Sequence, residues 1–209
     1  MNDQPTPRDK YSSQADSWTE AAYADADAYL AHRAKLVVAL GPQLEAGDTV
    51  LDLACGDGGL ADHLPRLRYL GVDASPEMVD AARRRGRDAA LGDLNEYEPP
   101  QPVTATTCFR AIYYARDRAA FFRRVAGYTE RKLVFDLNPR QYRVDDVRRD
   151  LRAAGFDRLD LRPFFAPQRV ALPRLAAGAL RVLERSGPLA RAVLAVRFSY
   201  LCAASRGGR

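Results

Sequence analysis

The sequence predicts an α/β fold: a doubly wound, seven-stranded, mostly parallel sheet with an antiparallel last strand, an N-terminal helical cap and an insertion before the last strand. Short apolar runs typical of buried strands alternate with segments whose apolar residues recur at helical spacing. Glycines and prolines that punctuate turns and helix ends stand between these segments. Such alternation favours a parallel sheet with helices on both faces.

Strands are expected at residues 49–54, 68–75, 88–93, 103–111, 131–138, 157–165 and 196–205. Helices are expected at residues 17–40, 59–65, 76–86, 117–128, 145–156 and 173–186. Pro76 suits a first helical turn, where no N–H donor is needed, and Gly86 suits a helix end. The elements define a tail with cap helices (1–40), a core (41–165), a helical insertion or lid (166–195), and a last strand with its tail (196–209).

Composition narrows the class of protein. The 209 residues are 47% hydrophobic and 28% charged, which is typical of one globular domain and excludes a disordered chain. The sequence has no run of about 18 uncharged apolar residues, so no transmembrane helix is expected. The first residues lack the apolar core of a secretory signal. Cys55, Cys108 and Cys202 are too far apart for a disulfide framework or a metal site, so a cytoplasmic location is expected.

Positive charge collects toward the C-terminus, where residues 163–209 hold eight arginines and a single acid, Glu184. The expected helix at 173–186 has one apolar face and one arginine face: Leu175, Ala179, Leu180 and Leu183 against Arg174, Arg181 and Arg185. We expect a lid over the substrate or a helix packed on the domain. Contact with an anionic membrane surface or with a partner subunit are the alternatives. Solvated arginine faces account for the charge, so nucleic acid is not the expected partner.

The segment VLDLACGDGGLADHL (50–64) is the most informative part of the chain. A strand ends in a glycine-rich turn that leads into a helix, and small residues there let a ligand approach the backbone closely. Taken alone, this turn imitates a dinucleotide-binding fingerprint, which is a weak signal.

Four carboxylates near strand ends indicate a different ligand. Asp52, Asp57, Asp73 and Asp93 should gather at one edge of a parallel sheet, where a pyrophosphate would meet unpaired negative charge. A nucleoside without phosphate that carries a cation suits this edge better. An acid after the second strand can hold two ribose hydroxyls. Asp57 is equally well explained as a cap of the following helix.

The stretches LDLACGDGG (51–59), LGVDASPEMVDAA (70–82), LGDLNEY (91–97) and FRAIYYARDRAAFFRRV (109–125) resemble the class I S-adenosylmethionine-dependent methyltransferases of small molecules, which have a Rossmann-like sheet. The resemblance covers about residues 20–160 and implies S-adenosylmethionine as cofactor. It implies roles by position: Asp52, Ala54 and Gly56 at the methionine part, Asp73 at the ribose, Ala74 and Met78 beside the adenosine, Asp93 and Leu94 at the adenine, and Cys108, Phe109 and Arg110 as the floor. It also implies an N-terminal residue at the methionine carboxylate, for which Tyr23 and Arg33 are the candidates.

Methyl transfer from a sulfonium is an in-line displacement, which requires that the reacting groups are aligned and that water is excluded. A base is needed only where the nucleophile must lose a proton. Many small-molecule relatives carry a histidine pair after the fourth strand, where this chain has Tyr113 and Tyr114. We take these two tyrosines and His32 as the candidate catalytic residues, with packing as the alternative for the tyrosines. Asp136, at the end of the fifth strand, is a candidate base or a cap of its turn.

The sequence therefore predicts an enzyme that methylates a small, partly apolar molecule at oxygen, nitrogen or carbon. Four alternatives remain open: a methyltransferase acting on RNA or another polyanion, a lipid methyltransferase at a membrane surface, an NAD(P)-dependent oxidoreductase, and a binder that kept the pocket without catalysis.

Overall fold

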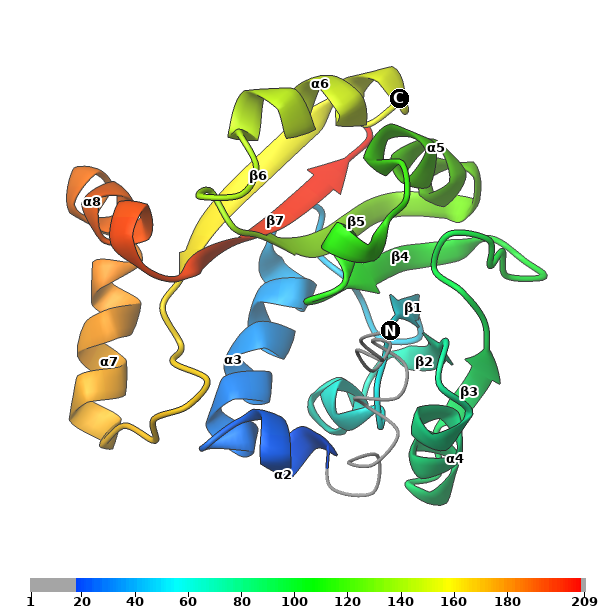
Figure 1. Ribbon diagram of the computed structural model, residues 1–209, viewed down its shortest axis with the longest axis horizontal. Helices are drawn as coiled ribbons and strands as arrows, with labels where there is room; N and C mark the ends of the chain where they lie inside the picture. Colours follow the sequence, from blue (N-terminus) through cyan, green and yellow to red (C-terminus); the bar gives the residue numbers. More distant parts are fainter. Residues whose placement is uncertain (1–17, 208–209) are drawn as a thin grey trace, which may run out of the picture.

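In the computed structural model, which describes residues 18–207, one seven-stranded sheet has the strand order β3-β2-β1-β4-β5-β7-β6 (Figure 1). The strands are β1 (Thr49–Leu53), β2 (Arg68–Asp73), β3 (Asp88–Leu91), β4 (Val103–Cys108), β5 (Thr129–Leu137), β6 (Arg158–Phe164) and β7 (Ser199–Ser205). Only β7 runs antiparallel to its neighbours, β5 and β6. The predicted seven-stranded fold with an antiparallel last strand is confirmed.

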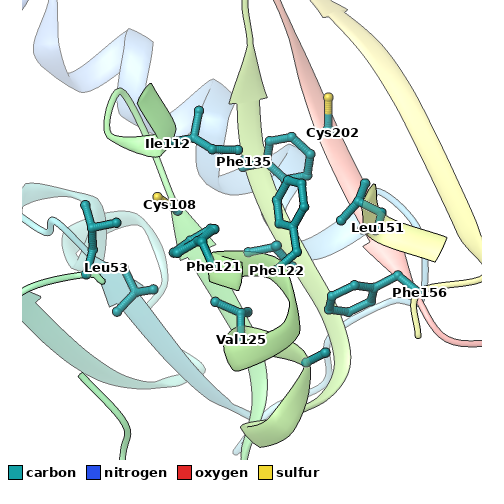
Figure 2. Close-up of a cluster of buried hydrophobic side chains, with 14 of the residues drawn as sticks. Leu53, Cys108, Ile112, Phe121, Phe122, Val125, Phe135, Leu151, Phe156 and Cys202 are labelled. Atoms are coloured by element: carbon teal, nitrogen blue, oxygen red, sulfur yellow. The ribbon is translucent and has the colours of Figure 1, made fainter. Parts of the chain in front are cut away.

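The central strands are buried on both faces, as their continuous apolar runs predict. On one face, α5 (Arg118–Tyr128) and α6 (Val144–Ala153) pack onto the sheet through a cluster of buried side chains that includes Phe122, Phe135 and Leu151 (Figures 1 and 2). On the other face, α3 (Ala26–Ala39) contributes Leu30 and Val37 to a second cluster. The two clusters fix the positions of the strand ends that carry the site.

Within the described residues, the N-terminal cap has two helices, α2 (Trp18–Ala22) and α3, instead of the single helix expected at 17–40. The break occurs because Asp25 caps α3: its side chain accepts a hydrogen bond from the backbone N–H of Ala28 at 3.0 Å. Residues 1–17 of the predicted tail and cap lie outside the described residues. The helix expected at 59–65 is a short 3₁₀ turn, Gly59–His63.

The helices that follow β2 and β6 were located to within a few residues, but the insertion holds one helix more than expected. Besides α4 (Pro76–Arg84) and α7 (Arg174–Leu183), the chain forms α8 (Pro188–Val196). The first helix of the insertion ends at Leu183, and Gly187, with a φ of 61°, stands at the N-cap of α8, which Pro188 opens at its first turn. No helix was predicted after the one at 173–186, so α8 is an addition to the predicted elements.

The insertion packs beside α3 and the ends of β6 and β7 (Figure 1). Its buried residues Ala190 and Leu194 lie against Phe165, whereas α7 has no fully buried residue. Leu175 and Val196 are 90% and 83% exposed. Within the described residues, no helix is long and apolar enough to cross a lipid bilayer.

Candidate active site

A cavity of about 620 Å³ lies at the carboxyl ends of β1, β2 and β4, where a doubly wound sheet usually binds its ligands. Of the residues predicted at the cofactor, Cys108 is fully buried and does not line this cavity. The others line it: Tyr23, Arg33, Asp52, Ala54, Gly56, Asp73, Ala74, Met78, Asp93, Leu94, Phe109 and Arg110. Tyr113 and Tyr114 line it as well. The fold thus brings together residues from separate segments of the N-terminal half of the chain and from the turn after β4.

The glycine-rich turn has the backbone that its sequence predicts. Ala54, Gly56 and Gly58 have positive φ angles of 60°, 58° and 73°. A Cβ atom on Gly56 would lie 2.8 Å from the ring of Trp18, so only glycine fits beneath that ring. The turn therefore presents its backbone directly to the cavity, with Trp18 packed above it.

Asp52 is 4% exposed and faces the cavity from β1. Its carboxylate accepts hydrogen bonds from the Tyr69 hydroxyl at 2.8 Å and from Thr107 Oγ1 at 2.7 Å. Burial raises the pKa of Asp52 to about 6, although these two hydrogen bonds and the charge of Arg33 lower it. Above pH 6 the group is a carboxylate in a largely dry site, suited to a cation.

Asp73 ends β2, and its carboxylate is held by the backbone. Gly56 N–H donates to one oxygen at 2.9 Å and Ser75 N–H donates to the other at 3.0 Å. Burial raises the pKa of Asp73 against the effect of these bonds. Each oxygen keeps acceptor capacity, so a pair of ligand hydroxyls can be bound without displacing the loop.

Asp93 lies beyond β3 and is held by a side chain that the sequence analysis did not consider. Arg116 donates to Asp93 at 3.0 Å, and Asn95 donates through its backbone and its side-chain amide at 2.8 Å each. Partial burial raises the pKa of Asp93, but these partners outweigh it and the net pKa is lowered. The ion pair between Arg116 and Asp93 is exposed, so a ligand amine can take the place of Arg116 at little cost in free energy.

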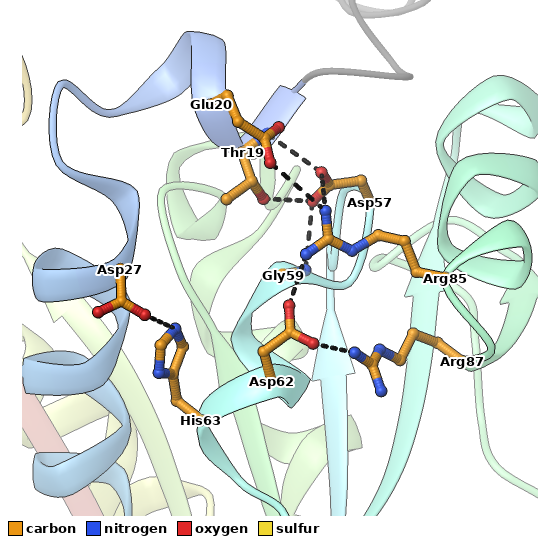
Figure 3. A network of polar contacts seen from close by, with 9 residues as sticks. All are labelled: Thr19, Glu20, Asp27, Asp57, Gly59, Asp62, His63, Arg85 and Arg87. Atoms are coloured by element: carbon orange, nitrogen blue, oxygen red, sulfur yellow. Dashed lines mark hydrogen bonds and ion pairs between the residues drawn. The ribbon is translucent and has the colours of Figure 1, made fainter.

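The open question about Asp57 is answered by its partners (Figure 3). The side chain is 1% exposed and accepts hydrogen bonds from the backbone N–H and hydroxyl of Thr19 and from the N–H of Gly59. Arg85 lies 3.5 Å from the same carboxylate. Asp57 thus caps the turn and attaches α2 to it. Its carboxylate already has partners within the protein, so it is not needed to bind a ligand.

We expect Thr19→Val to loosen α2 and to destabilise the protein by about 2 kcal/mol, because a hydroxyl bonded to a buried carboxylate is lost. Trp18 is the only tryptophan of the chain, so its emission should shift to longer wavelength as the helix detaches. Asp62→Asn is the control, since Asp62 belongs to the outer, exposed part of the same network. Equal emission spectra for the wild type and Thr19→Val would contradict the role given to Asp57.

The other end of the cavity is positively charged. Arg33 is 4% exposed, donates to the Tyr29 hydroxyl at 2.7 Å and to the Tyr23 hydroxyl at 3.4 Å, and stacks 4.3 Å from the ring centre of Phe109. Arg110 follows β4 with a φ of 55°, and its backbone N–H donates to Asp136 at 2.7 Å.

Burial lowers the pKa of both guanidinium groups, but the neighbouring tyrosines more than offset this effect, so the net pKa of each is raised. Burial likewise raises the pKa of Asp136. Asp136 holds the backbone of the turn after β4 and not that of its own turn, and it does not line the cavity.

His32 does not line the cavity, so the prediction of a catalytic His32 is not supported. Its Nε2 lies 3.0 Å from Glu184, whose carboxylate also accepts from the N–H of Phe165 at 2.8 Å. The ring stacks on Phe164. His32 thus links α3 to the end of α7, a contact between segments far apart in the sequence that no local pattern reveals.

The lid predicted from residues 166–195 is also absent from the cavity wall, which none of these residues lines. Leu180 and Leu183 pack toward Phe165 and α8, which agrees with the other alternative, a helix packed on the domain. Trp18 and the half-exposed Tyr113 and Tyr114 form that wall. Trp18 was not among the predicted site residues, because nothing in the neighbouring sequence shows that α2 reaches the glycine-rich turn.

The strand order and the antiparallel β7 are those of the Rossmann-like methyltransferase fold. Residues 50–132, which include the glycine-rich turn of the acid-lined cavity, match the family model described as a methyltransferase domain. The trans-aconitate 2-methyltransferase of Mycobacterium tuberculosis (strain ATCC 25177 / H37Ra) is 37% identical over an alignment 107 residues long, which covers 46% of this chain and 40% of that protein. The chain thus spans well under half the length of that curated relative.

Two solved structures show the fold over nearly the whole chain. One is a chain of the complex between the Haloferax volcanii Trm112 methyltransferase activator and a methyltransferase, at a TM-score of 0.65 and 20% identity, covering 97% of this chain and all of that one. The other is magnesium protoporphyrin IX methyltransferase from Synechocystis with bound S-adenosylmethionine, at a TM-score of 0.55 and 17% identity, covering 99% of this chain and 87% of that one.

Proposed function

We propose that this protein transfers the methyl group of S-adenosylmethionine to a small, partly apolar acceptor molecule. The observation that carries the proposal is that Asp52, Asp73 and Asp93 line one cavity together with aromatic side chains. A cationic nucleoside without phosphate matches the charge of this edge, whereas a dinucleotide does not. The match to a methyltransferase domain favours the same conclusion over an oxidoreductase.

The residues present fit this cofactor. Asp73 has acceptor capacity for the two ribose hydroxyls, and Asp93 can accept from the adenine amine once Arg116 moves aside. Met78 is 2% exposed and lines the cavity beside Ala74, where an adenine ring would pack. The ionised Asp52 and the buried Arg33 face the cavity near the glycine-rich turn and suit the ammonium and carboxylate groups of the methionine part.

The sulfonium supplies an activated methyl group: its S–CH₃ bond breaks as a bond to the acceptor atom forms, and S-adenosylhomocysteine leaves with the electron pair. The protein has to align the acceptor and keep water out. Trp18, Phe109, Tyr113 and Tyr114 provide an aromatic wall for an apolar acceptor. The two tyrosine hydroxyls can orient an acceptor atom, and the acceptor's own proton, where it has one, goes to solvent or to a basic group of the acceptor.

The curated relatives support a small acceptor. They carry the name trans-aconitate 2-methyltransferase, and trans-aconitate is a small organic molecule. The match to the methyltransferase domain, over residues 50–132, includes the glycine-rich turn, so that match supports the cofactor assignment most directly.

Isothermal titration with S-adenosylhomocysteine tests the proposal. We expect one molecule to bind per chain, because one cavity holds all the predicted cofactor residues. NAD⁺ is the control ligand, and we expect no binding, because its pyrophosphate would face the carboxylates. Folded protein that binds NAD⁺ and not S-adenosylhomocysteine would overturn the proposed function.

A further inference from the structure

Two guanidinium groups at one end of the cavity have polar atoms without partners. Nε of Arg33 and one terminal nitrogen of Arg110 are buried, and neither has a hydrogen-bond partner among the described residues. Both arginines line the cavity. A buried donor without a partner is costly, so such a pair indicates a ligand that supplies acceptors.

The free nitrogen of Arg110 has no acceptor in the immediate surroundings of the two guanidiniums. Asp136 interacts electrostatically with both arginines, but it uses one oxygen for the backbone N–H of Arg110. The aromatic rings of Trp18, Tyr23, Tyr29 and Phe109 also surround them, and Asp52 interacts electrostatically with Arg33. The methionine carboxylate of the proposed cofactor can supply an acceptor to Arg33, whereas the buried terminal nitrogen of Arg110 then still needs one.

The two arginines differ in position. Arg33 is fixed by two tyrosine hydroxyls and acts electrostatically on Asp52, which places it at the methionine end. Arg110 lies over the rings of Trp18 and Tyr23, with 5.6 Å and 5.8 Å between its guanidinium carbon and the ring centres. It also interacts electrostatically with Tyr113. The left-handed backbone of Arg110, held by Asp136, fixes the direction of this side chain.

We infer that Arg110 binds a carboxylate of the methyl acceptor, so that the acceptor is a small organic anion whose apolar part lies against Tyr113 and Tyr114. The inference rests on the proposed function and narrows its substrate class. A guanidinium binds a carboxylate through two parallel hydrogen bonds, which both neutralises and orients it. A phosphate dianion fits less well, because Asp52 and Asp73 share the cavity and repel additional negative charge.

Binding of matched pairs of acids and amides to the protein saturated with S-adenosylhomocysteine tests the inference. Cinnamate and benzoate, with cinnamamide and benzamide as uncharged counterparts, are titrated calorimetrically at up to about 10 mM, a range that detects weak binding. We expect both acids to bind at least about tenfold more tightly than their amides. Acids that do not bind, or that bind no better than their amides, would overturn the inference.

Arg110→Met keeps the length of the side chain and removes its charge. We expect it to weaken acid binding at least about tenfold while the affinity for S-adenosylhomocysteine stays within about twofold, and Arg110→Lys to retain part of the acid binding. Arg123→Met is the matched control, because Arg123 is exposed on α5 and lies outside the cavity wall. Acid binding that Arg110→Met leaves unchanged would also overturn the inference. Loss of S-adenosylhomocysteine binding by the wild type would instead count against the proposed function itself.

Discussion

Asp73→Ala is expected to weaken the binding of S-adenosylhomocysteine at least about 100-fold. The variant removes the acceptors for both ribose hydroxyls, and hydrogen bonds to a charged group contribute about 1.5–3 kcal/mol each. It also leaves the N–H groups of Gly56 and Ser75 without their acceptor, so the glycine-rich turn loses a tie to β2. Isothermal titration measures the affinity, and circular dichroism confirms that the sheet is intact.

Asp88→Ala is the matched control, since Asp88 is exposed at the opposite, amino end of β3. We expect it to bind S-adenosylhomocysteine like the wild type. Asp73→Asn should fall between the two, because the amide keeps one acceptor. An Asp73→Ala variant with wild-type affinity would remove the ribose assignment, and with it the main support for the orientation of the cofactor in the cavity.

Asp52→Asn is expected to make the protein more stable at neutral pH and less able to bind S-adenosylmethionine. Burial raises the pKa of Asp52 from 3.8 to about 6, so between these values the native state binds more protons than the unfolded state. The free energy of unfolding of the wild type therefore falls as pH rises from about 4 to about 6. The ionised group costs up to about 3 kcal/mol above that window, at about 1.4 kcal/mol per pKa unit.

The asparagine variant lacks this titration, so its stability advantage should grow between about pH 4 and pH 6 and then level off. Urea unfolding at several pH values measures the difference. The affinity of the wild type for S-adenosylmethionine should rise through the same window, as the carboxylate ionises, whereas that of Asp52→Asn should stay low and flat. A variant that is less stable than the wild type at pH 7 would contradict the assignment of Asp52 as a binding carboxylate kept at a cost in stability.

The parts of the site that could be predicted from the sequence are those fixed by one strand and the turn after it. Asp52, Asp73 and Asp93 stand at or beyond strand ends, and the parallel sheet alone is enough to bring them to one edge. The seven strands could be located from their apolar runs, because each run lies within one short segment of the chain.

The features that were missed depend on contacts between distant segments. Trp18 reaches Gly56 only because Thr19 is fastened to Asp57, and His32 is removed from the site by a bond to Glu184, which is 152 residues away. The helix α8 escaped notice because a Gly-Pro pair ends one helix as readily as it begins the next. Spacing within a segment carries no information about such pairings.

The position of β7 between β5 and β6 has a consequence for biosynthesis. Within the described residues, β6 pairs only with β7, which follows it in the chain, so during translation β6 is synthesised before its partner. The strands that carry Asp52 and Asp73 pair with each other and with β3 and β4, all of which precede β6, and can assemble on the nascent chain. The strands of the site can thus pair early, whereas β6 stays unpaired until β7 has been synthesised.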